Sequence, residues 1–524
     1  MRTIILTILV INSLVTAGWA ANNSYSFYAV VPTPSLNVTG VKYSDNDAAV
    51  EGTSCVPGTT VVNDGNFWLC DTGGVYTKPI TVWEQAGTKV YLKDTNATNF
   101  VGIGTSDPEF KLTLDQDGGI LAKGSVGSGV TPTTAGAGTR LMWIPSKSAL
   151  RAGTVGATQW DNANIGNYSV AFGLNNEAFG VATNINGGSG NTADQNYSTI
   201  GGGSNNNITD WPAFPYYTNS VIAGGNTNTI DQSGNAFIGG GYSNSIGNAA
   251  EYSVIGGGNN NTIPVNISYA SIVGGTNNLA NDAGGFIGGG LNNSVAGGLT
   301  GFNVVVGGVD NDIGGGTSTH GFIGGGTTNK ISGQYSVIGG GSNNTIPPVG
   351  YLGMGHTIAG GINNKAGGNL LFEGHATVSG GHTNSALGDY SAVGGGKTNT
   401  ASGYASAVPG GQDNIAAGDH SVAMGQNAQI SAAGDNTFAY VSSGAPVSIT
   451  QPNSAVFYGV NVGIGITAPT QSLHISQAMR LEPMDSPPSC EEGVMYAHTS
   501  GALCYCSAGS WTDLTDGKTG GFCP

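Results

Sequence analysis

Six cysteines are the residues of this sequence best suited to chemistry, and all of them lie near the two ends of the chain. They are Cys55, Cys70, Cys490, Cys504, Cys506 and Cys523. Cysteines in proteins hold zinc or form disulfides. The last four lack the paired C-x-x-C spacing of a zinc knuckle, so their spacing favours disulfides. Cys55 and Cys70 form the simplest first pair, while the other four allow three connectivities between which the spacing does not choose.

The first 20 residues predict export to an oxidising compartment in which disulfides form. Arg2 is followed by an apolar run from Thr3 to Val10, and small residues lead up to Ala20. This is the pattern of a secretory signal peptide of bacterial type, which is removed from the mature chain. No later stretch has eighteen consecutive apolar residues, so we expect no membrane-spanning helix. The protein is predicted to be secreted or held at a cell surface.

The two cysteine-bearing ends share one layout. Cys55-x-x-Gly58 leads to Leu69-Cys70, just as Cys490-x-x-Gly493 leads to Leu503-Cys504. We therefore expect a small disulfide-bearing β-hairpin module at each end, within residues 21–100 and 481–524.

No group of residues between these ends predicts catalysis. Triple glycines recur without the Lys-Ser/Thr pair of a phosphate-binding loop, and the calcium-binding nonapeptide GGxGxDxUx is not present in register. Carboxylates such as Asp389, Asp413 and Asp419 occur singly, whereas glycan hydrolysis needs two at a defined separation. We expect no catalytic residues, no cofactor, no bound metal and no enzymatic activity.

Three histidines stand where other copies of a repeated phrase have tyrosine. They are His320, His375 and His420, and the tyrosines are Tyr168, Tyr252, Tyr335 and Tyr390. Two interpretations remain: the histidines pack as rings in place of tyrosine, or they line the axis of an assembly or bind a metal.

Composition places the chain in the all-β class and excludes several partners. Glycine accounts for 91 of 524 residues, and only 9% of residues are charged, against about 25% in ordinary domains. The net charge of −16 excludes a basic surface for nucleic acid. Helix formers are scarce and β-branched residues are common, which favours strands.

A phrase of about fifteen residues recurs through residues 165–432. Typical copies are YSTIGGGSNNNI (197–208), FIGGGYSNSI (237–246), YSVIGGGNNNTI (252–263) and YSVIGGGSNNTI (335–346). The apolar residue before the glycines, for example Ile323 and then Ile338, returns at steps of 15 to 20, apart from a step of 22 after Ile200 that holds an insertion. Such a period is typical of a solenoid.

The letters of one repeat predict a coil of a parallel β-solenoid. The apolar run is a short strand, the glycines turn the chain where a Cβ would clash, and Thr345-Ile346 begins a second strand. Two strands of about five residues with two tight turns account for about fifteen residues. Asparagines in corresponding turns, such as Asn343-Asn344, are expected to form amide ladders along the stack.

The repeats resemble those of YadA-like heads, which belong to the trimeric autotransporter adhesins. YSVAFGLNNEAFG (168–180) and HSVAMGQNAQISAAG (420–434) carry this resemblance, and GGG-x-NN is a variant of the repeat. The resemblance covers about half of the chain. It implies a left-handed parallel β-roll, a homotrimer and an adhesive function. The residues after 433 lack the family's heptad stalk and membrane-barrel strands, so no direct membrane anchor is expected.

A second phrase marks the segments that flank the repeats. Val101-Gly102-Ile103-Gly104 is echoed by Val462-Gly463-Ile464-Gly465, and an alternating strand follows each. We assign residues 101–164 and 433–480 to adaptors that resemble those of exported fibre proteins. Leu141 and Trp143 in the first adaptor are expected to cap the open first coil.

These features predict a secreted or cell-surface structural fibre with adhesin-like function. An insertion places four aromatic residues where they suit contact with a host, matrix or glycan ligand: Trp211, Phe214, Tyr216 and Tyr217. A second insertion, with Tyr351, Met354 and His356, is a further candidate. The alternatives are a polysaccharide-degrading fibre enzyme and an ice-binding solenoid.

Overall fold

The computed structural model of the chain contains two compact units, Met1–Leu121 and Ala122–Pro524. In the first unit the structure describes short strands between residues 60 and 114, and residues 119–121. In the second unit it describes every residue except 130, 134, 211–217, 299–300, 316–317, 349–353, 369–373, 486–488, 516–522 and 524.

The strands of the first unit form three small sheets. Their bounds are β1 (Thr60–Asn63), β2 (Asn66–Cys70), β3 (Tyr76–Thr77), β4 (Glu84–Ala86), β5 (Lys89–Tyr91), β6 (Val101–Ile103) and β7 (Leu112–Leu114). β1, β2 and β3 pair antiparallel in that order, as do β4 and β5. Cys70 ends β2, but Cys55 lies outside the described residues, so the pairing of these two cysteines stays a prediction.

The two copies of the VGIG phrase fold in the same way. Val101 pairs with Leu112 in the parallel pair β6–β7, and Val462 pairs with Leu473 in the parallel pair β44 (Val462–Ile464) and β45 (Leu473–Ile475). The paired residues are eleven positions apart in both copies. The phrase is therefore a structural module and not only a similarity of letters.

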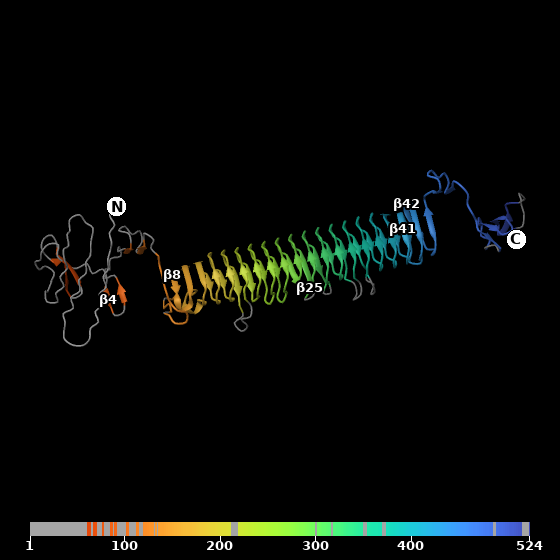
Figure 1. Cartoon of the computed structure of the whole chain (residues 1–524). Coiled ribbons are helices and arrows are strands. Elements are labelled where there is room, and N and C mark those ends of the chain that lie inside the picture. The colour runs from red at the N-terminus through yellow and green to blue at the C-terminus, as the bar shows by residue number, and fades with distance from the viewer. Residues whose placement is uncertain are drawn as a thin grey trace. The chain divides into compact units, whose positions relative to one another are not determined.

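Most of the second unit is the predicted parallel β-solenoid, with about 20 turns. In Figure 1 its turns follow one another in a single stack from β8 to β42. Each turn contributes one strand to each of two parallel sheets, which we call face A and face B. Face A consists of β9 (Ala149–Val155), β10 (Val170–Leu174), β12 (Asn184–Ile185), β14 (Thr199–Ile200), β16 (Val221–Ile222), β18 (Phe237–Ile238), β20 (Val254–Ile255), β22 (Ser271–Ile272), β24 (Phe286–Ile287), β26 (Val304–Val305), β28 (Phe322–Ile323), β30 (Val337–Ile338), β32 (Thr357–Ile358), β34 (Thr377–Val378), β36 (Ala392–Val393), β38 (Ala407–Val408), β41 (Val422–Ile430), β42 (Phe438–Ile449) and β43 (Ala455–Tyr458).

Face B is built from the second strand of each turn. It consists of β11 (Glu177–Ala178), β13 (Thr192–Ala193), β15 (Asn207–Thr209), β17 (Thr229–Asp231), β19 (Ser245–Ile246), β21 (Thr262–Ile263), β23 (Leu279–Asp282), β25 (Ser294–Gly298), β27 (Asp312–Gly314), β29 (Lys330–Ile331), β31 (Thr345–Ile346), β33 (Lys365–Ala366), β35 (Ser385–Ala386), β37 (Thr400–Ala401), β40 (Ile415–Ala416) and the second halves of β41 and β42. The short strand β39 (Gly411–Gln412) also pairs with β41.

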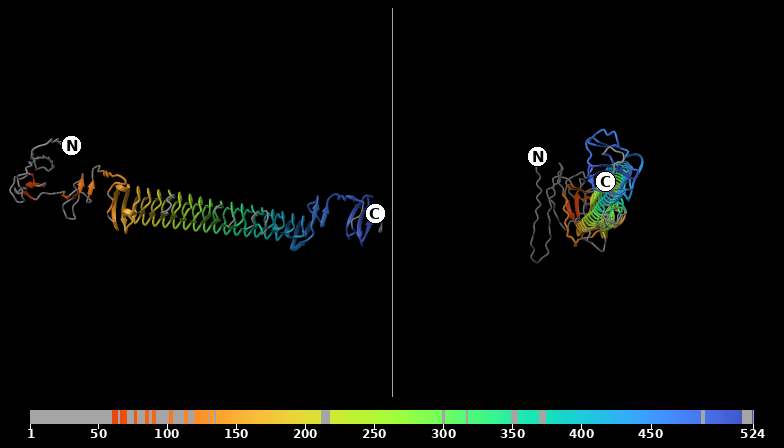
Figure 2. Two further views of the ribbon diagram at one scale, coloured as in Figure 1. Left: turned by 90° about the horizontal axis from the view of Figure 1, so that it is seen from below. Right: turned by 90° about the vertical axis from the view of Figure 1, so that its right-hand side faces the viewer.

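The repeat length predicts strands of about five residues, but most of the strands contain only two. A third ladder, made of single β-bridges between the two faces, adds backbone pairing between successive turns. For example, Thr327 pairs with Ser342, and Ser342 pairs with Ile362. The stack also continues past residue 432, where we placed the end of the repeats, because β42 pairs with β41 and β43 pairs with β42, both in parallel. Figure 2 shows the regular stacking in a second view.

The core consists of two columns of inward-facing apolar residues. On face A the column contains the residues that mark the repeat period, such as Ile323 and Ile338, and on face B it contains partners such as Ile331 and Ile346. These side chains are fully buried. Each turn alone encloses only a pair of such side chains, so stability comes from stacking on neighbouring turns.

A hairpin covers the amino-terminal end of this core. β8 (Gly138–Ile144) and β9 pair antiparallel around the 3-10 turn η1 (Pro145–Lys147), and β9 pairs with β10 in parallel. A second 3-10 turn, η2 (Asn162–Asn164), follows. The hairpin caps the first coil as expected, but Leu141 and Trp143 do not, because they point outward and are 78% and 44% exposed.

The side chains that close the core come from other positions of the cap. Ile144 and Ala149 pack with Ile165, and Trp160 is fully buried with Nε1 donating to the carbonyl of Asn176 at 2.9 Å. Arg151, also fully buried, donates to the carbonyls of Ser169 and Ala178 and to the Ser169 hydroxyl. Burial lowers the pKa of this guanidinium to about 10. Trp160 thus supplies the donor for the Asn176 carbonyl, whereas the carbonyls of Ser169 and Ala178 also accept the backbone amide hydrogens of Leu150 and Gly166.

The carboxyl-terminal cysteines form two disulfides within one small sheet. β46 (Pro483–Met484), β47 (Met495–His498), β48 (Leu503–Ser507) and β49 (Ser510–Asp513) pair in that order. Cys490 bonds to Cys506 and Cys504 to Cys523, with Cα–Cα distances of 5.4 and 5.9 Å. The structure thus selects one of the three predicted connectivities and confirms the disulfide-bearing hairpin at this end.

Candidate functional site

The outward positions of face A form an exposed surface that carries no charge. The first of the two outward columns begins at Leu150 on β9, beside Trp143 of β8, and then runs through the first residue of each later strand: Val170, Asn184, Thr199, Val221, Phe237, Val254, Ser271, Phe286, Val304, Phe322, Val337, Thr357, Thr377, Ala392, Ala407, Val422, Phe438 and Ala455. The second column lies two residues later on each strand. Neither column contains an acidic residue, a basic residue or a histidine in the part of face A that the structure describes.

Large residues in one column lie beside small residues in the other. The ring of Phe237 covers Gly239, because a Cβ on Gly239 would lie 3.4 Å from Phe237 Cε1. Phe286 covers Gly288 and Phe322 covers Gly324 in the same way. Where the first column holds the small Ser271, the second holds Val273, which is 55% exposed. The alternation gives the middle of face A an even apolar surface of half-exposed side chains.

Face B is different in chemistry. Its outward column carries hydroxyl-bearing and amide residues on most turns, including Thr192, Asn207, Thr229 and Ser245. It also carries Glu177, Lys365 and an ion pair in which Lys330 Nζ lies 3.3 Å from Asp312 Oδ2. A polar face B is what a solvated surface requires, whereas an extended uncharged face A is typical of an interaction surface.

A column of rings runs along the turn that leads into face A. Tyr335 stacks on His320 with ring centroids 4.9 Å apart, and Tyr252 stacks on Tyr269 at 5.2 Å. His375 stacks on Tyr390 at 5.5 Å. The expectation that these histidines occupy tyrosine positions is therefore confirmed. Among the described residues no group of three acidic, histidine or cysteine side chains is placed to hold a metal ion.

The backbone under this ring column is left-handed. Tyr335 has φ +51° and His320 has φ +57°, a conformation that bulky residues adopt only where the surroundings enforce it. The amide of Tyr335 donates to the carbonyl of Thr319 at 2.8 Å, and that of His320 to Gly301 at 2.7 Å. Each turn thus holds the ring of the next in place, so the column is a rigid, half-exposed edge beside face A.

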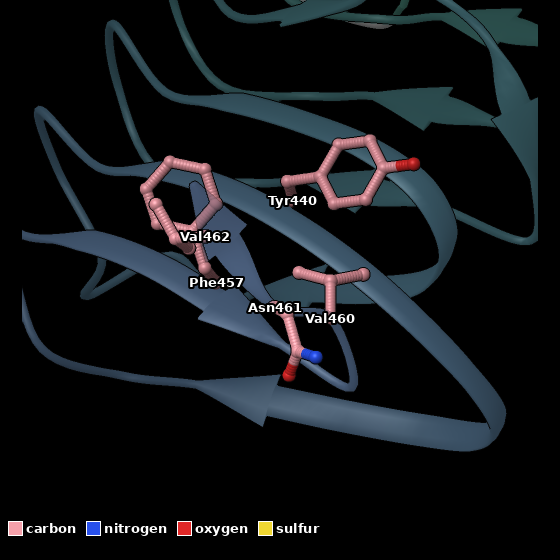
Figure 3. A pocket seen from close by; sticks show the side chains of 5 residues that line it. All are labelled: Tyr440, Phe457, Val460, Asn461 and Val462. Carbon is pink, nitrogen blue, oxygen red and sulfur yellow. The ribbon is translucent and has the colours of Figure 1, made fainter. Parts of the chain in front are cut away.

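A shallow hollow lies where the last turns of face A meet the adaptor that follows. Its walls are Tyr440, Phe457, Val460, Asn461 and Val462, and its volume is about 380 Å³ (Figure 3). Tyr440 and Phe457 belong to the second outward column, on β42 and β43. Their exposed fractions of 38% and 50% make the hollow a continuation of the apolar surface of face A.

An acidic cluster lies on the first turns of face B, where sequence reasoning found no paired carboxylates. Burial, together with the nearby Glu177 and Asp210, raises the pKa of Asp194 to about 6. Burial also raises the pKa of Glu177. Glu177 pairs in register with Thr192, which lies two residues before Asp194. The repeat spacing therefore could have predicted that Glu177 and Asp194 lie close together.

Most of the ligand-contact residues predicted in the two insertions are not among the residues that the structure describes. Trp211, Phe214, Tyr216 and Tyr217 lie outside the described residues, as does Tyr351. His356, in contrast, is described and is only 2% exposed, with Nδ1 accepting the amide hydrogen of Ala376 at 3.1 Å. The prediction that His356 contributes to a contact surface is therefore wrong, because this ring fills the interior of its turn.

The sequence matches no known protein-family model, and no curated protein is detectably similar to it. The resemblance to YadA-like heads therefore rests on the repeat phrases alone. No helix in the described residues has the length and hydropathy needed to cross a membrane.

Proposed function

We propose that this protein is a secreted, non-enzymatic structural fibre with adhesin-like function, in which three chains assemble through face A. The observation that carries the proposal is the absence of charge over the full described length of face A, opposite a polar and charged face B. Continuous exposed apolar surface is rare in soluble monomers and marks sites of association. A homotrimer is the assembly that the resemblance to YadA-like heads implies.

The assembly leaves face B and the turns as the outer surface. A stiff stack of turns with a polar exterior suits the presentation of binding sites for a host, matrix or glycan ligand. The contact predicted at Trp211 and Tyr216 belongs to this proposal. Binding of the full chain and of its Trp211→Ala and Tyr216→Ala variants to glycan and matrix-protein arrays tests it.

Lysine substitutions on matched turns test the role of face A. Phe286→Lys and Val337→Lys place charges on face A, while Ser294→Lys and Thr345→Lys place the same charges on face B of the same turns. Light scattering after chromatography of the secreted full chain should give three times the chain mass for the wild type and the face B variants. The face A variants should give the mass of one chain, with an unchanged β-rich circular dichroism spectrum.

Two results would contradict the proposal. A wild-type mass of a single chain would remove the trimer, and equal behaviour of face A and face B variants would remove the role of face A. Turnover of a polysaccharide by the wild type that Asp194→Asn abolishes would instead support the enzymatic alternative.

A further inference from the structure

The two ends of the solenoid are the places where its ladders stop. Among the described strands, β8 pairs only with β9, and β43 pairs only with β42. A strand such as β30 between them has a partner on each side. The outer edges of β8 and β43 thus present rows of backbone N–H and C=O groups, which are ready templates for another strand.

Apolar side chains flank both edges. Leu141 and Trp143 project from β8, and Phe457 and Tyr458 project from β43, each of them about half exposed or more. Exposed edge strands in natural proteins are normally protected by charge, proline or a covering segment. Neither strand contains a proline or an acidic residue, and Arg140 is the one basic residue in the two.

Among the residues that the structure describes, the segment just before β8 does not pair with the outer edge of this strand. The segment before it passes the turn at η1 instead, where the amide of Gly127 donates to the carbonyl of Ser146 at 2.8 Å. At the other end, the residues after β43 contribute Val460 and Val462 to the hollow beside Tyr440, on the outward side of face A. The described parts of both neighbouring segments therefore leave these edges uncovered.

The two ends carry opposite charge. Residues 119–165 contain four basic residues, Lys123, Arg140, Lys147 and Arg151, against one acidic residue, Asp161, whose Oδ1 accepts the amide hydrogen of Gly136. Residues 405–460 contain Asp413, Asp419 and Asp435 and no lysine or arginine. Opposite fields on the two ends favour contact between unlike ends and oppose contact between like ends.

We infer that these chains associate end to end, with β8 of one copy adding to the edge of β43 of the next. The two surfaces differ, so the contact is heterologous, and a heterologous contact that does not close into a ring builds an open filament. Each added copy extends the stack by about 20 turns, or roughly 95 Å at a spacing of about 4.8 Å. The inference does not depend on the trimer, because growth in length is separate from association through face A.

Variants in which one end of the solenoid is blocked test whether the chains associate end to end. Leu141→Lys places a charge beside the edge of β8, and Phe457→Lys does so beside β43; lysine at an edge is a natural block to strand addition. By electron microscopy, the secreted wild-type chain should form rods in multiples of one solenoid length. Each variant alone should give single-length rods, and an equal mixture should give rods of twice that length and no longer, because each pair retains one compatible junction.

The controls separate this contact from the lateral one. Val254→Lys, in the middle of face A, should change rod width or mass per length and leave end-to-end growth intact. A chain with both end substitutions should stay at single length. Raising the salt from about 0.01 M to about 1 M shortens the Debye length from about 30 to about 3 Å and should shorten the wild-type rods. Single-length wild-type rods at all concentrations, or a mixture that fails to double in length, would overturn the inference.

Discussion

The side-chain amide of Asn344 donates a 3.1 Å hydrogen bond to Oδ1 of Asn329, the corresponding residue one turn earlier. Its other bonds go to the carbonyl of Gly340 in its own turn and to that of Gly361 in the next turn. A buried column of asparagines repeats this contact on successive turns, and at Asn364, Asn384 and Asn399 the backbone N–H donates to the preceding Oδ1 instead of the side-chain amide. The column is Asn176, Asn191, Asn206, Asn228, Asn244, Asn261, Asn278, Asn293, Asn311, Asn329, Asn344, Asn364, Asn384, Asn399 and Asn414. The ladder supplies the donor for one glycine carbonyl of each turn, such as that of Gly340, while the other, such as that of Gly361, also accepts a backbone amide hydrogen.

We expect removal of one rung of this ladder to destabilise the solenoid. Asn329→Ala removes the acceptor of the backbone and side-chain amides of Asn344 and leaves the carbonyl of Gly325 without its amide donor, whereas the carbonyl of Gly341 keeps the backbone amide of Thr327. Buried polar groups without partners cost about 1–3 kcal/mol each, so the total should be roughly 2–4 kcal/mol. Denaturant unfolding of the full chain measures this, and Thr345→Ala on face B should shift the midpoint little. Equal effects of the two substitutions would contradict a structural role for the ladder.

Two adjacent glycines in one turn, Gly340 and Gly341, should differ in how much stability they lose when replaced by alanine. A Cβ on Gly341, which has φ +91°, would lie 2.1 Å from the carbonyl oxygen of Gly361 in the next turn. A Cβ on Gly340 would have the carbonyl oxygen of Gly325 as its nearest neighbour, at 4.0 Å. Gly341→Ala should therefore destabilise by about 2 kcal/mol or more, and Gly340→Ala by much less. Thermal melts of the two variants measured together test this, and a reversed order would show that the turn packs differently.

His356 should make the protein less stable in acid. Burial, followed by the nearby His375, lowers its pKa from 6.5 to about 4, so the unfolded chain binds a proton between these values that the folded chain excludes. Stability from this group is present above about pH 6.5 and is lost as the pH falls toward 4, by up to about 3 kcal/mol. Melting temperatures from pH 7 to 4 should fall more steeply for the wild type than for His356→Gln. Parallel profiles of melting temperature against pH for the two proteins would contradict a neutral, buried ring at His356.

The carboxyl group of Asp194 should change stability with pH in the direction opposite to His356, over nearly the same pH range. Its pKa is raised to about 6 in the folded chain, against 3.8 in the unfolded chain, so the folded state binds the extra proton. The stability from this group is complete below about pH 4 and is lost as the pH rises through 6. Asp194→Asn should therefore raise the melting temperature at pH 7 relative to the wild type and leave it nearly unchanged at pH 4. A loss of stability at pH 7 would instead indicate that the carboxylate is held by a favourable partner.

The repeat pattern by itself determined most of the solenoid. Residues that touch in a solenoid lie one turn apart in the sequence, so the period that brings Ile323 to Ile338 also identifies which asparagines and which rings stack. The amide ladder and the stacking of His320 with Tyr335 were predictable for this reason. The two cysteine-bearing modules and the paired VGIG segments were visible as duplications.

Contacts without this periodicity were decided by the tertiary structure. The choice of Cys490 with Cys506 depends on where β47 and β48 turn, which spacing alone leaves open. The cap uses Trp160, and not Leu141 and Trp143, because a terminal coil must provide a donor for the Asn176 carbonyl as well as cover apolar side chains. Only the folded chain shows where that carbonyl points. The contrast between face A and face B likewise appears only when the outward positions of all turns are aligned in space.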